Sequence, residues 1–297
     1  MTPRMFHLSA GDLEATVEPA FGGRVTAFRR KGVDLFVPVP GRHGDPAKAG
    51  AGGCFPLVPW SNRIRDGRLT HDGQVVELTR TETGGSSAIH GHGRRISWRV
   101  MGDGGASSVR MSYVFPAGEE GWPFSYVADQ TVSLSEDALS ITLSVENSSS
   151  RPMPAGLGLH PYLPRTPEMG LWFSAASAWP PVDGKLPAGA EPVPSELDFS
   201  EPRPVVLGLD QGFGGWDGSV HAIWPERGLG MGIHAGASLN HLIVFTPSDR
   251  DYVCVEPVSH CIDADNLAAR GVAGTGHRLL APGERLAAIV RFQVEVF

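Results

Sequence analysis

The chain has 297 residues and a formal net charge of −7 without any long basic run, so we do not expect a nucleic-acid partner. Its 38 glycines and 25 prolines disfavour long helices and predict short segments joined by tight turns. No apolar stretch reaches the roughly 18 residues of a membrane-spanning helix, so no membrane partner is expected either.

The cysteines and the first residues bear on where the protein works. Cys54, Cys254 and Cys261 form no Cys-x-x-Cys pair, and an odd number of cysteines suits free thiols in a reducing compartment. Asp12 and Glu14 interrupt the region in which a signal peptide would carry its apolar core. We therefore expect a cytoplasmic protein.

Alternation of apolar and polar residues is the dominant pattern along the chain. It covers residues 13–17, 109–115, 139–145 and 286–296. A period of two places one set of side chains on one face, so each segment is predicted to be a half-buried strand. The last segment is long enough to run the length of a large sheet.

More continuous apolar runs at 242–245 and 252–255 predict strands that are buried more deeply. Only residues 263–270 suggest a short helical turn, and no amphipathic helix of ten residues is found. Many strands without helices predict an all-β sandwich or barrel.

Two segments break this pattern. Residues 38–53 are rich in Gly, Pro and Ala, and residues 179–204 contain seven prolines. Neither separates regions of different composition. We therefore interpret both as loops of a single domain that covers residues 1–297.

Two polar groups follow turns in the first third of the chain. Asn62 and Arg63 follow a Pro-Trp turn, and an amide beside a guanidinium suits sugar hydroxyls, although an arginine that ties a loop to a carboxylate is the favoured alternative from these residues alone. His90 and His92, two residues apart, are expected to face the same side of a strand. No cysteine or further histidine lies nearby to complete a tetrahedral set, so no metal is expected.

Two later residues are candidates for acid–base chemistry. His160 precedes a proline, which favours an extended backbone, and the glycines before it allow another strand or a ligand to approach closely. A hydrogen-bonded core histidine is the alternative. Glu256 ends a buried apolar run, where a lone carboxylate is costly unless it is paired, neutral or functional. A salt bridge to Arg63 is the alternative, and the predicted burial favours function.

Taken in order, these groups resemble the galactose mutarotase (aldose 1-epimerase) family. The matching segments are Asn62-Arg63-Ile64, Ile89-His90-Gly91, His160-Pro161-Tyr162, Leu209-Asp210, Glu256-Pro257 and Leu280-Ala281-Pro282-Gly283-Glu284. They cover nearly the whole chain. The resemblance implies a large antiparallel β-sandwich with a cleft across one sheet.

The resemblance also implies the roles of individual residues. His160 would be the acid and Glu256 the base of a mutarotase that interconverts the α and β anomers of a free hexose. The implied substrate-binding residues are Asn62, Arg63, His90 and Asp210. The implied partner is a small-molecule sugar, with no cofactor, and the oligomeric state is not indicated. Many family members carry a Gln-x-Tyr-Thr segment one strand before the glutamate, where this chain reads Ile243-Val-Phe-Thr246.

The acid must be protonated at the start of the reaction, so we expect a nearby carboxylate or solvent to hold the His160 pKa near neutral.

One rival function is a hexose-6-phosphate 1-epimerase, with Arg65, Arg94 and Arg95 as candidate phosphate clamps. The Gly52-Gly53-Cys54-Phe55-Pro56 segment lacks the arginine that sugar-phosphate relatives carry there. A second rival is a carbohydrate-binding or sensing module without catalysis, which would not need an acid–base pair.

Overall fold

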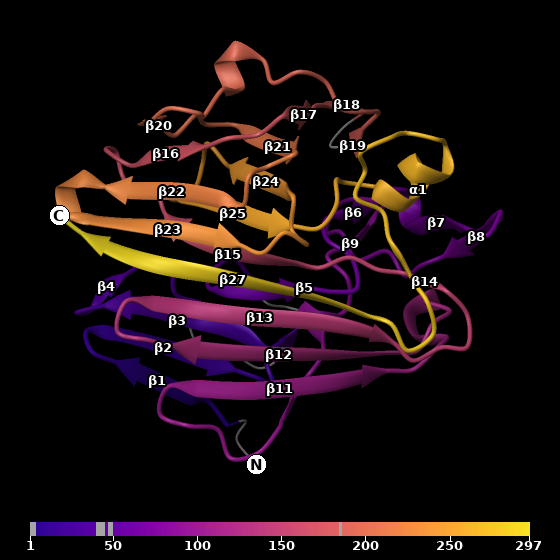
Figure 1. Ribbon diagram of the computed structural model, residues 1–297, viewed down its shortest axis with the longest axis horizontal. Helices are drawn as coiled ribbons and strands as arrows, with labels where there is room; N and C mark the ends of the chain where they lie inside the picture. Colours follow the sequence, from indigo (N-terminus) through magenta and orange to yellow (C-terminus); the bar gives the residue numbers. More distant parts are fainter. Residues whose placement is uncertain (1–3, 40–44, 47–49, 184–185) are drawn as a thin grey trace.

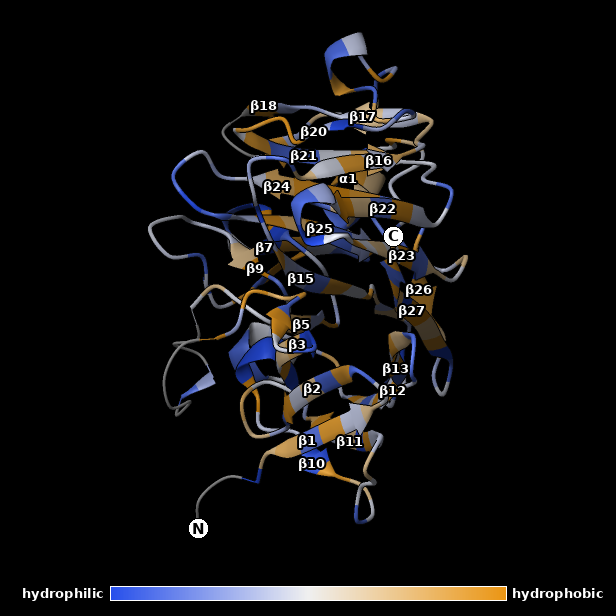
Figure 2. Ribbon diagram, turned by 90° about the vertical axis from the view of Figure 1, so that its left-hand side faces the viewer, coloured by the Kyte–Doolittle hydropathy of each residue, from blue (hydrophilic) through white to orange (hydrophobic). Residues whose placement is uncertain are grey.

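The computed structural model describes residues 4–39, 45–46, 50–183 and 186–297. In this part of the chain, two large antiparallel sheets lie face to face, and Figure 2 shows these two layers edge-on. The all-β sandwich expected from the sequence is confirmed. No helix among the described residues is long and apolar enough to span a membrane.

The first sheet carries the candidate site. Its strands, in spatial order, are β1 (Phe6–Ala10), β2 (Leu13–Glu18), β3 (Arg24–Arg30), β5 (Cys54–Leu57), β15 (Gly158–Pro164), β25 (Tyr252–Val258), β24 (His241–Thr246), β21 (Leu209–Gly214) and β17 (Ser177–Trp179), with β4 (Val33–Asp34) paired to β3.

The second sheet covers the other side of the core and lies at the front of Figure 1. Its strands, in spatial order, are β10 (Arg99–Val100), β11 (Ser108–Phe115), β12 (Tyr126–Leu134), β13 (Ala138–Asn147), β27 (Arg285–Val296), β23 (Leu229–Ala235), β22 (Ser219–Trp224), β16 (Gly170–Phe173) and β20 (Arg203–Pro204). The long strand expected at 286–296 is therefore confirmed as β27.

Short elements join the strands of the sheets. The paired short strands are β6 (Arg63–Ile64) with β9 (Ala88–Ile89), β7 (Arg68–His71) with β8 (Gln74–Glu77), β14 (Met153–Pro154) with β26 (Leu279–Leu280), and β18 (Pro181–Asp183) with β19 (Leu186–Pro187). The helical turns are η2 (Arg65–Gly67), η3 (Gly93–Arg95), η4 (Glu119–Gly121), η5 (Ser195–Leu197), η6 (Pro225–Arg227) and α1 (Ala264–Ala269).

Period-two alternation separates the core from the outer face, as predicted. In β13, Leu139, Ile141 and Leu143 point into the main apolar cluster between the sheets, where they are 2% exposed or less. Removing such side chains from water contributes about 1.5–3 kcal/mol each. The same alternation in the first sheet sends the intervening side chains to its outer face.

Several local expectations need correction. The segment 179–204 is not one loop, since it holds β18, β19, β20 and the last residue of β17. Glu256 lies two residues before the end of β25 rather than at it. His90 and His92 do not share a strand, because β9 ends at Ile89. Much of the loop expected at 38–53 lies outside the described residues.

Candidate active site

Strand register brings His160 and Glu256 together. β15 and β25 are antiparallel neighbours, with Gly158 opposite Val258 and Tyr162 opposite Cys254. This register places His160 across from Glu256, and the period of two sends both side chains to the outer face of the first sheet. A Cβ atom on Gly158 would lie 2.9 Å from the Pro257 carbonyl oxygen. The close strand approach predicted from the glycines is therefore confirmed.

The His160 imidazole is held between aromatic rings. Phe55 stacks on it with ring centroids 4.5 Å apart, and Tyr162 stacks on it at 4.7 Å. Phe55 comes from the neighbouring β5, where it is the register partner of His160. These contacts fix the plane of the imidazole and leave its edge directed along the sheet face.

A direct contact joins the two candidate catalytic groups. His160 Nε2 lies 3.2 Å from Glu256 Oε1. Both side chains are nearly inaccessible, with residue exposures of 5% and 2%. His160 Nδ1 and Glu256 Oε2 are buried without a hydrogen-bond partner among the described residues. Because such atoms are costly when unpaired, they are suited to contacts with a ligand.

Burial shifts the two pKa values in opposite directions. Desolvation raises the pKa of Glu256 well above its usual value, and the nearby Asp210 carboxylate raises it further while Arg63 lowers it. Desolvation lowers the pKa of His160 well below its usual value, helped by the positive charges of Arg94 and Arg24. The expectation of a near-neutral His160 pKa is thus wrong, because burial and two cations outweigh the backbone hydrogen bond that raises it.

Arg63 connects the loop after β5 to β21. Its Nε donates to Glu82 Oε1 at 2.7 Å, and its Nη1 donates to Asn62 Oδ1 at 3.0 Å and lies 3.5 Å from Asp210 Oδ2. The salt bridge from Arg63 to Glu256 that was the alternative is therefore replaced by contacts with Glu82 and Asp210. Glu82 was missed in the sequence because nothing in its own segment pairs it with Arg63.

His90 joins this group, and His92 does not. The His90 backbone has a φ of 63°, and its ring centroid lies 5.1 Å from that of His160. The Asn62 backbone N–H donates to His90 Nδ1 at 3.2 Å, which leaves Nε2 as a donor for a ligand. The His92 ring instead enters the core between the sheets and contacts the Tyr126 hydroxyl at 2.8 Å. The expectation that both histidines face one side is wrong.

The three arginines that were candidate phosphate clamps do not converge. Arg95 makes two hydrogen bonds to the Glu120 carboxylate, and Arg65 lies 3.8 Å from Asp263. Only Arg94 faces the His160 side, with its guanidinium carbon 5.6 Å from the Phe55 ring centre. A further cation, Arg24, lies 4.6 Å from the same ring. The sequence gives no clear signal for it, because the strand that Arg24 begins also contains Arg29 and Arg30.

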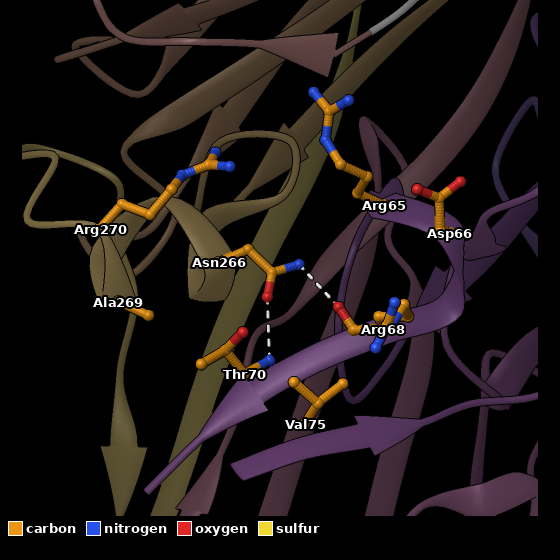
Figure 3. Close-up of a pocket in the computed structure, with 8 residues that line it drawn as sticks. All are labelled: Arg65, Asp66, Arg68, Thr70, Val75, Asn266, Ala269 and Arg270. Carbon is orange, nitrogen blue, oxygen red and sulfur yellow. Dashed lines mark hydrogen bonds between the residues drawn. The ribbon is translucent and has the colours of Figure 1, made fainter. Parts of the chain in front are cut away.

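Two open pockets contain neither His160 nor Glu256. One, of about 400 Å³, is lined by Arg63, Glu82 and the residues of 83–87. The other, of about 280 Å³, lies between α1 and β7, where Asn266 bridges the backbone of Arg68 and Thr70 (Figure 3). The first opens next to Arg63 and therefore borders the candidate site. The second contains none of the residues expected to bind substrate.

The position one strand before Glu256 is apolar. Ile243 of β24 is the register partner of Glu256. Gln211, on the next strand, is buried and donates through its own amide to the Gly212 carbonyl oxygen. An aliphatic side chain therefore lies opposite the glutamate, where the family resemblance implied an amide.

Comparisons with known proteins identify the family of the chain. The sequence model of the aldose 1-epimerase family matches residues 4–293. The uncharacterised protein YphB of Escherichia coli K12 is 30% identical over 301 residues, which cover 98% of this chain and 99% of YphB.

Solved structures share the fold. A crystal structure from Escherichia coli K12, provisionally named an aldose 1-epimerase, superposes with a TM-score of 0.87 at 27% identity and covers 99% of both chains. A galactose mutarotase-like protein from Clostridium acetobutylicum superposes at 0.84 with 20% identity, over 98% of this chain and 95% of that one, and supports the fold alone. On the family match over nearly its whole length, the chain belongs to the aldose 1-epimerase family.

Proposed function

We propose that the protein is a mutarotase that interconverts the α and β anomers of a free hexose, with Glu256 as base and His160 as acid. The observation that carries the proposal is the contact of 3.2 Å between the two groups, with one atom of each left unpartnered and buried among the described residues. A carboxylate and an imidazole in reach of one anomeric centre are what hemiacetal opening requires.

The reaction uses both groups in each direction. Glu256 takes the proton of the anomeric hydroxyl while His160 protonates the ring oxygen, and the C1–O5 bond breaks to give the open aldehyde. Rotation about C1–C2 exposes the other carbonyl face. Reclosure returns one proton to His160 from the C5 hydroxyl and one from Glu256 to the new anomeric oxygen. No proton is gained or lost over the cycle.

The shifted pKa values fit one half of this cycle. Burial favours the neutral pair, a protonated Glu256 beside an unprotonated His160. That is the protonation state which the mechanism reaches when the sugar ring is open. The closed-ring complex needs the charged pair, which hydrogen bonds from sugar hydroxyls would stabilise. Because both groups are nearly inaccessible, the sugar must part them on binding.

Substrate contacts are assigned to the surrounding polar residues. His90 Nε2 and the Asn62 amide are donors, while the Asp210 carboxylate accepts from a hydroxyl on the C1–C2 side. Arg63 orients Asp210 and borders the open pocket at 83–87. A sensing module without catalysis would gain nothing from the buried acid–base contact.

Two observations favour a free hexose over its 6-phosphate. Arg95 is paired with Glu120 and Arg65 lies near Asp263, so neither joins Arg94 in a phosphate clamp. The net charge of −7 repels a dianion at long range.

Polarimetry tests the proposal directly. Freshly dissolved α-D-galactose and α-D-glucose should reach anomeric equilibrium at a rate that rises in proportion to protein concentration. Their 6-phosphates, at equal concentration and fixed ionic strength, should show a lower kcat/KM. A rate equal to that of buffer for every sugar would overturn the proposal, and a tenfold preference for a phosphate ester would overturn the choice of a free hexose.

A further inference from the structure

Arg94 is held rigidly beside the proposed acid. It belongs to η3, and the backbone N–H groups of His92 and Gly93 donate to the Val58 carbonyl oxygen at 2.9 and 3.1 Å. A Cβ atom on Gly22 would lie 2.1 Å from the Arg94 carbonyl oxygen, so only glycine allows this backbone contact. The guanidinium lies beside Phe55, the ring that stacks on His160.

Within the described part of the chain, the guanidinium of Arg94 has no counterion. Its Nε is buried without a hydrogen-bond partner, and no described residue makes a hydrogen bond or ion pair with the side chain. Its sequence neighbour Arg95 is matched by Glu120, and Arg63 by Glu82 and Asp210. Arg94 thus differs from these two arginines in that its charge stays uncompensated.

Arg24 adds a second positive charge near Arg94. It is fully buried, and its Nη1 donates to the carbonyl oxygens of Gly50 and Gly52, whereas its Nε and Nη2 have no partner among the described residues. Burial and the charge of Arg94 together lower its pKa to about 10, although the buried Glu18 carboxylate opposes this shift. Two neighbouring cations in a poorly solvated place cost free energy unless an anion joins them. A ligand can supply that anion.

The direction of charge across the site indicates which end of the sugar this anion occupies. Asp210 belongs to β21, which lies on the Glu256 side of the sheet beyond β25 and β24, where the anomeric hydroxyl would bind. Arg94 and Arg24 lie against Phe55 of β5, which stacks on His160, so both are on the His160 side, where the ring oxygen would bind. In a pyranose the ring oxygen is bonded to C5, and C5 carries C6. A charged group at C6 is therefore placed on the arginine side.

We propose that Arg94 binds a carboxylate at C6 of the sugar, so that the preferred substrates are hexuronates. This inference rests on the proposed function and narrows its substrate class. A carboxylate matches a guanidinium in charge and in planar geometry, and two parallel hydrogen bonds can form. A neutral hexose would leave Arg94 unpaired. A 6-phosphate would place a second negative charge farther from the ring, where Arg65 and Arg95 do not reach because they face Asp263 and Glu120.

Substrate preference is the first test. Exchange NMR measures anomer interconversion at equilibrium for any reducing sugar, with D-galacturonate and D-glucuronate compared with D-galactose, D-glucose and the two 6-phosphates. We expect kcat/KM for the hexuronates to exceed that for the hexoses by at least about tenfold, which is the contribution of roughly one charge-assisted hydrogen bond. The advantage should shrink as salt is added.

Matched arginine variants form the second test. Arg94→Gln should reduce the ratio of hexuronate to hexose kcat/KM by about 10- to 100-fold, and Arg94→Lys should reduce it less. The control Arg95→Gln changes the adjacent residue, which faces Glu120, and should leave the ratio unchanged. Without ligand, Arg94→Gln should melt at the same or a higher temperature, since it removes an uncompensated charge that is partly buried.

The outcomes separate this inference from the proposed function. Turnover of hexoses without a preference for hexuronates, or an Arg94→Gln variant that lowers both activities equally, overturns the inference and leaves the mutarotase proposal intact. A preference for 6-phosphates overturns the hexuronate class. If no sugar is turned over, the mutarotase proposal fails. The carboxylate site then stands only if galacturonate raises the melting temperature of the wild type and not that of Arg94→Gln.

Discussion

His92 and His160 are both buried and both stack on aromatic rings, yet their nitrogens have different surroundings. The His92 ring lies 3.9 Å from that of Phe115, and its Nδ1 joins a chain of hydrogen bonds through Tyr126 to Tyr113. The His160 Nδ1 has no partner among the described residues, and its Nε2 faces a carboxyl group with another unpartnered atom. The Nδ1 atom of His92, between the sheets, is thus hydrogen-bonded within the protein. The Nδ1 atom of His160, on the outer face of the first sheet, is not.

This difference separates stability from function. Polar groups that are hydrogen-bonded inside the fold are expected to stabilise it. Buried polar groups without a partner lower the free energy of unfolding and are retained for activity. Variants at His92 should therefore lose mainly stability, whereas variants at His160 should lose mainly activity.

Glu256→Gln should give the largest effect. Glutamine keeps the shape of the side chain and cannot accept the anomeric proton, so kcat should fall by at least about 10²-fold. Polarimetry gives the rate, and the melting temperature should stay at or above that of the wild type. A turnover rate close to that of the wild type would remove Glu256 from its role as base.

His160→Ala should remove most of the activity as well, because the ring oxygen loses its proton donor. We expect kcat to fall by about 10²-fold or more, in the range that one positioned acid contributes. The far-ultraviolet circular dichroism spectrum checks that the sheets persist. Full activity would show that His160 serves packing between Phe55 and Tyr162.

The sequence predicted the sheets better than the details of the site. Alternation in 139–145 and 286–296 marks strands because every second residue is apolar, and such patterns follow from local chemistry. The order of strands, the contact of His160 with Glu256 and the partners of Arg63 depend on register between segments far apart in the chain. The shifted pKa of His160 needed the positions of Arg24 and Arg94, which no local pattern provides.

Acid should destabilise the protein through its interior histidines. Burial lowers the pKa of His92 to about 3, so in the folded state it stays neutral where the unfolded chain takes up a proton near pH 6.5. The contribution of neutral His92 to the free energy of unfolding is complete above pH 6.5 and is lost as the pH falls toward 3. Urea titrations at pH 7 and pH 5 should show a loss of about 2 kcal/mol from this residue.

The variant His92→Phe provides the comparison for that measurement. It keeps a ring against Phe115 and cannot bind a proton, so its free energy of unfolding should fall less steeply between pH 7 and pH 5. The variant should be less stable at pH 7, because the Tyr126 hydroxyl loses its partner. Equal pH slopes for the two proteins would contradict a neutral His92.

His90→Asn should have a smaller effect, on KM more than on kcat. The proposed role of His90 is to donate a hydrogen bond to the sugar, and losing one such contact corresponds to about a tenfold rise in KM. Initial rates over a range of sugar concentrations separate the two constants. If kcat instead fell by about 10²-fold while KM stayed constant, His90 would belong to the proton transfer.

The smallest effect is expected from chelation, since exhaustive EDTA treatment should leave kcat unchanged. The two histidines whose spacing suggested a metal diverge, because the ring of His90 lies against His160 and that of His92 contacts Tyr126 between the sheets. Among residues 4–39, 45–46, 50–183 and 186–297, no three His, Cys, Asp or Glu side chains are arranged to hold a metal ion together. The proposed mechanism also assigns each proton to a side chain. Activity should be measured by polarimetry before and after dialysis against chelator, with elemental analysis of the dialysed protein. A loss of turnover that Zn²⁺ restores would show that metal ligands come together when the sugar binds. The roles of His160 as acid and Glu256 as base would then need revision.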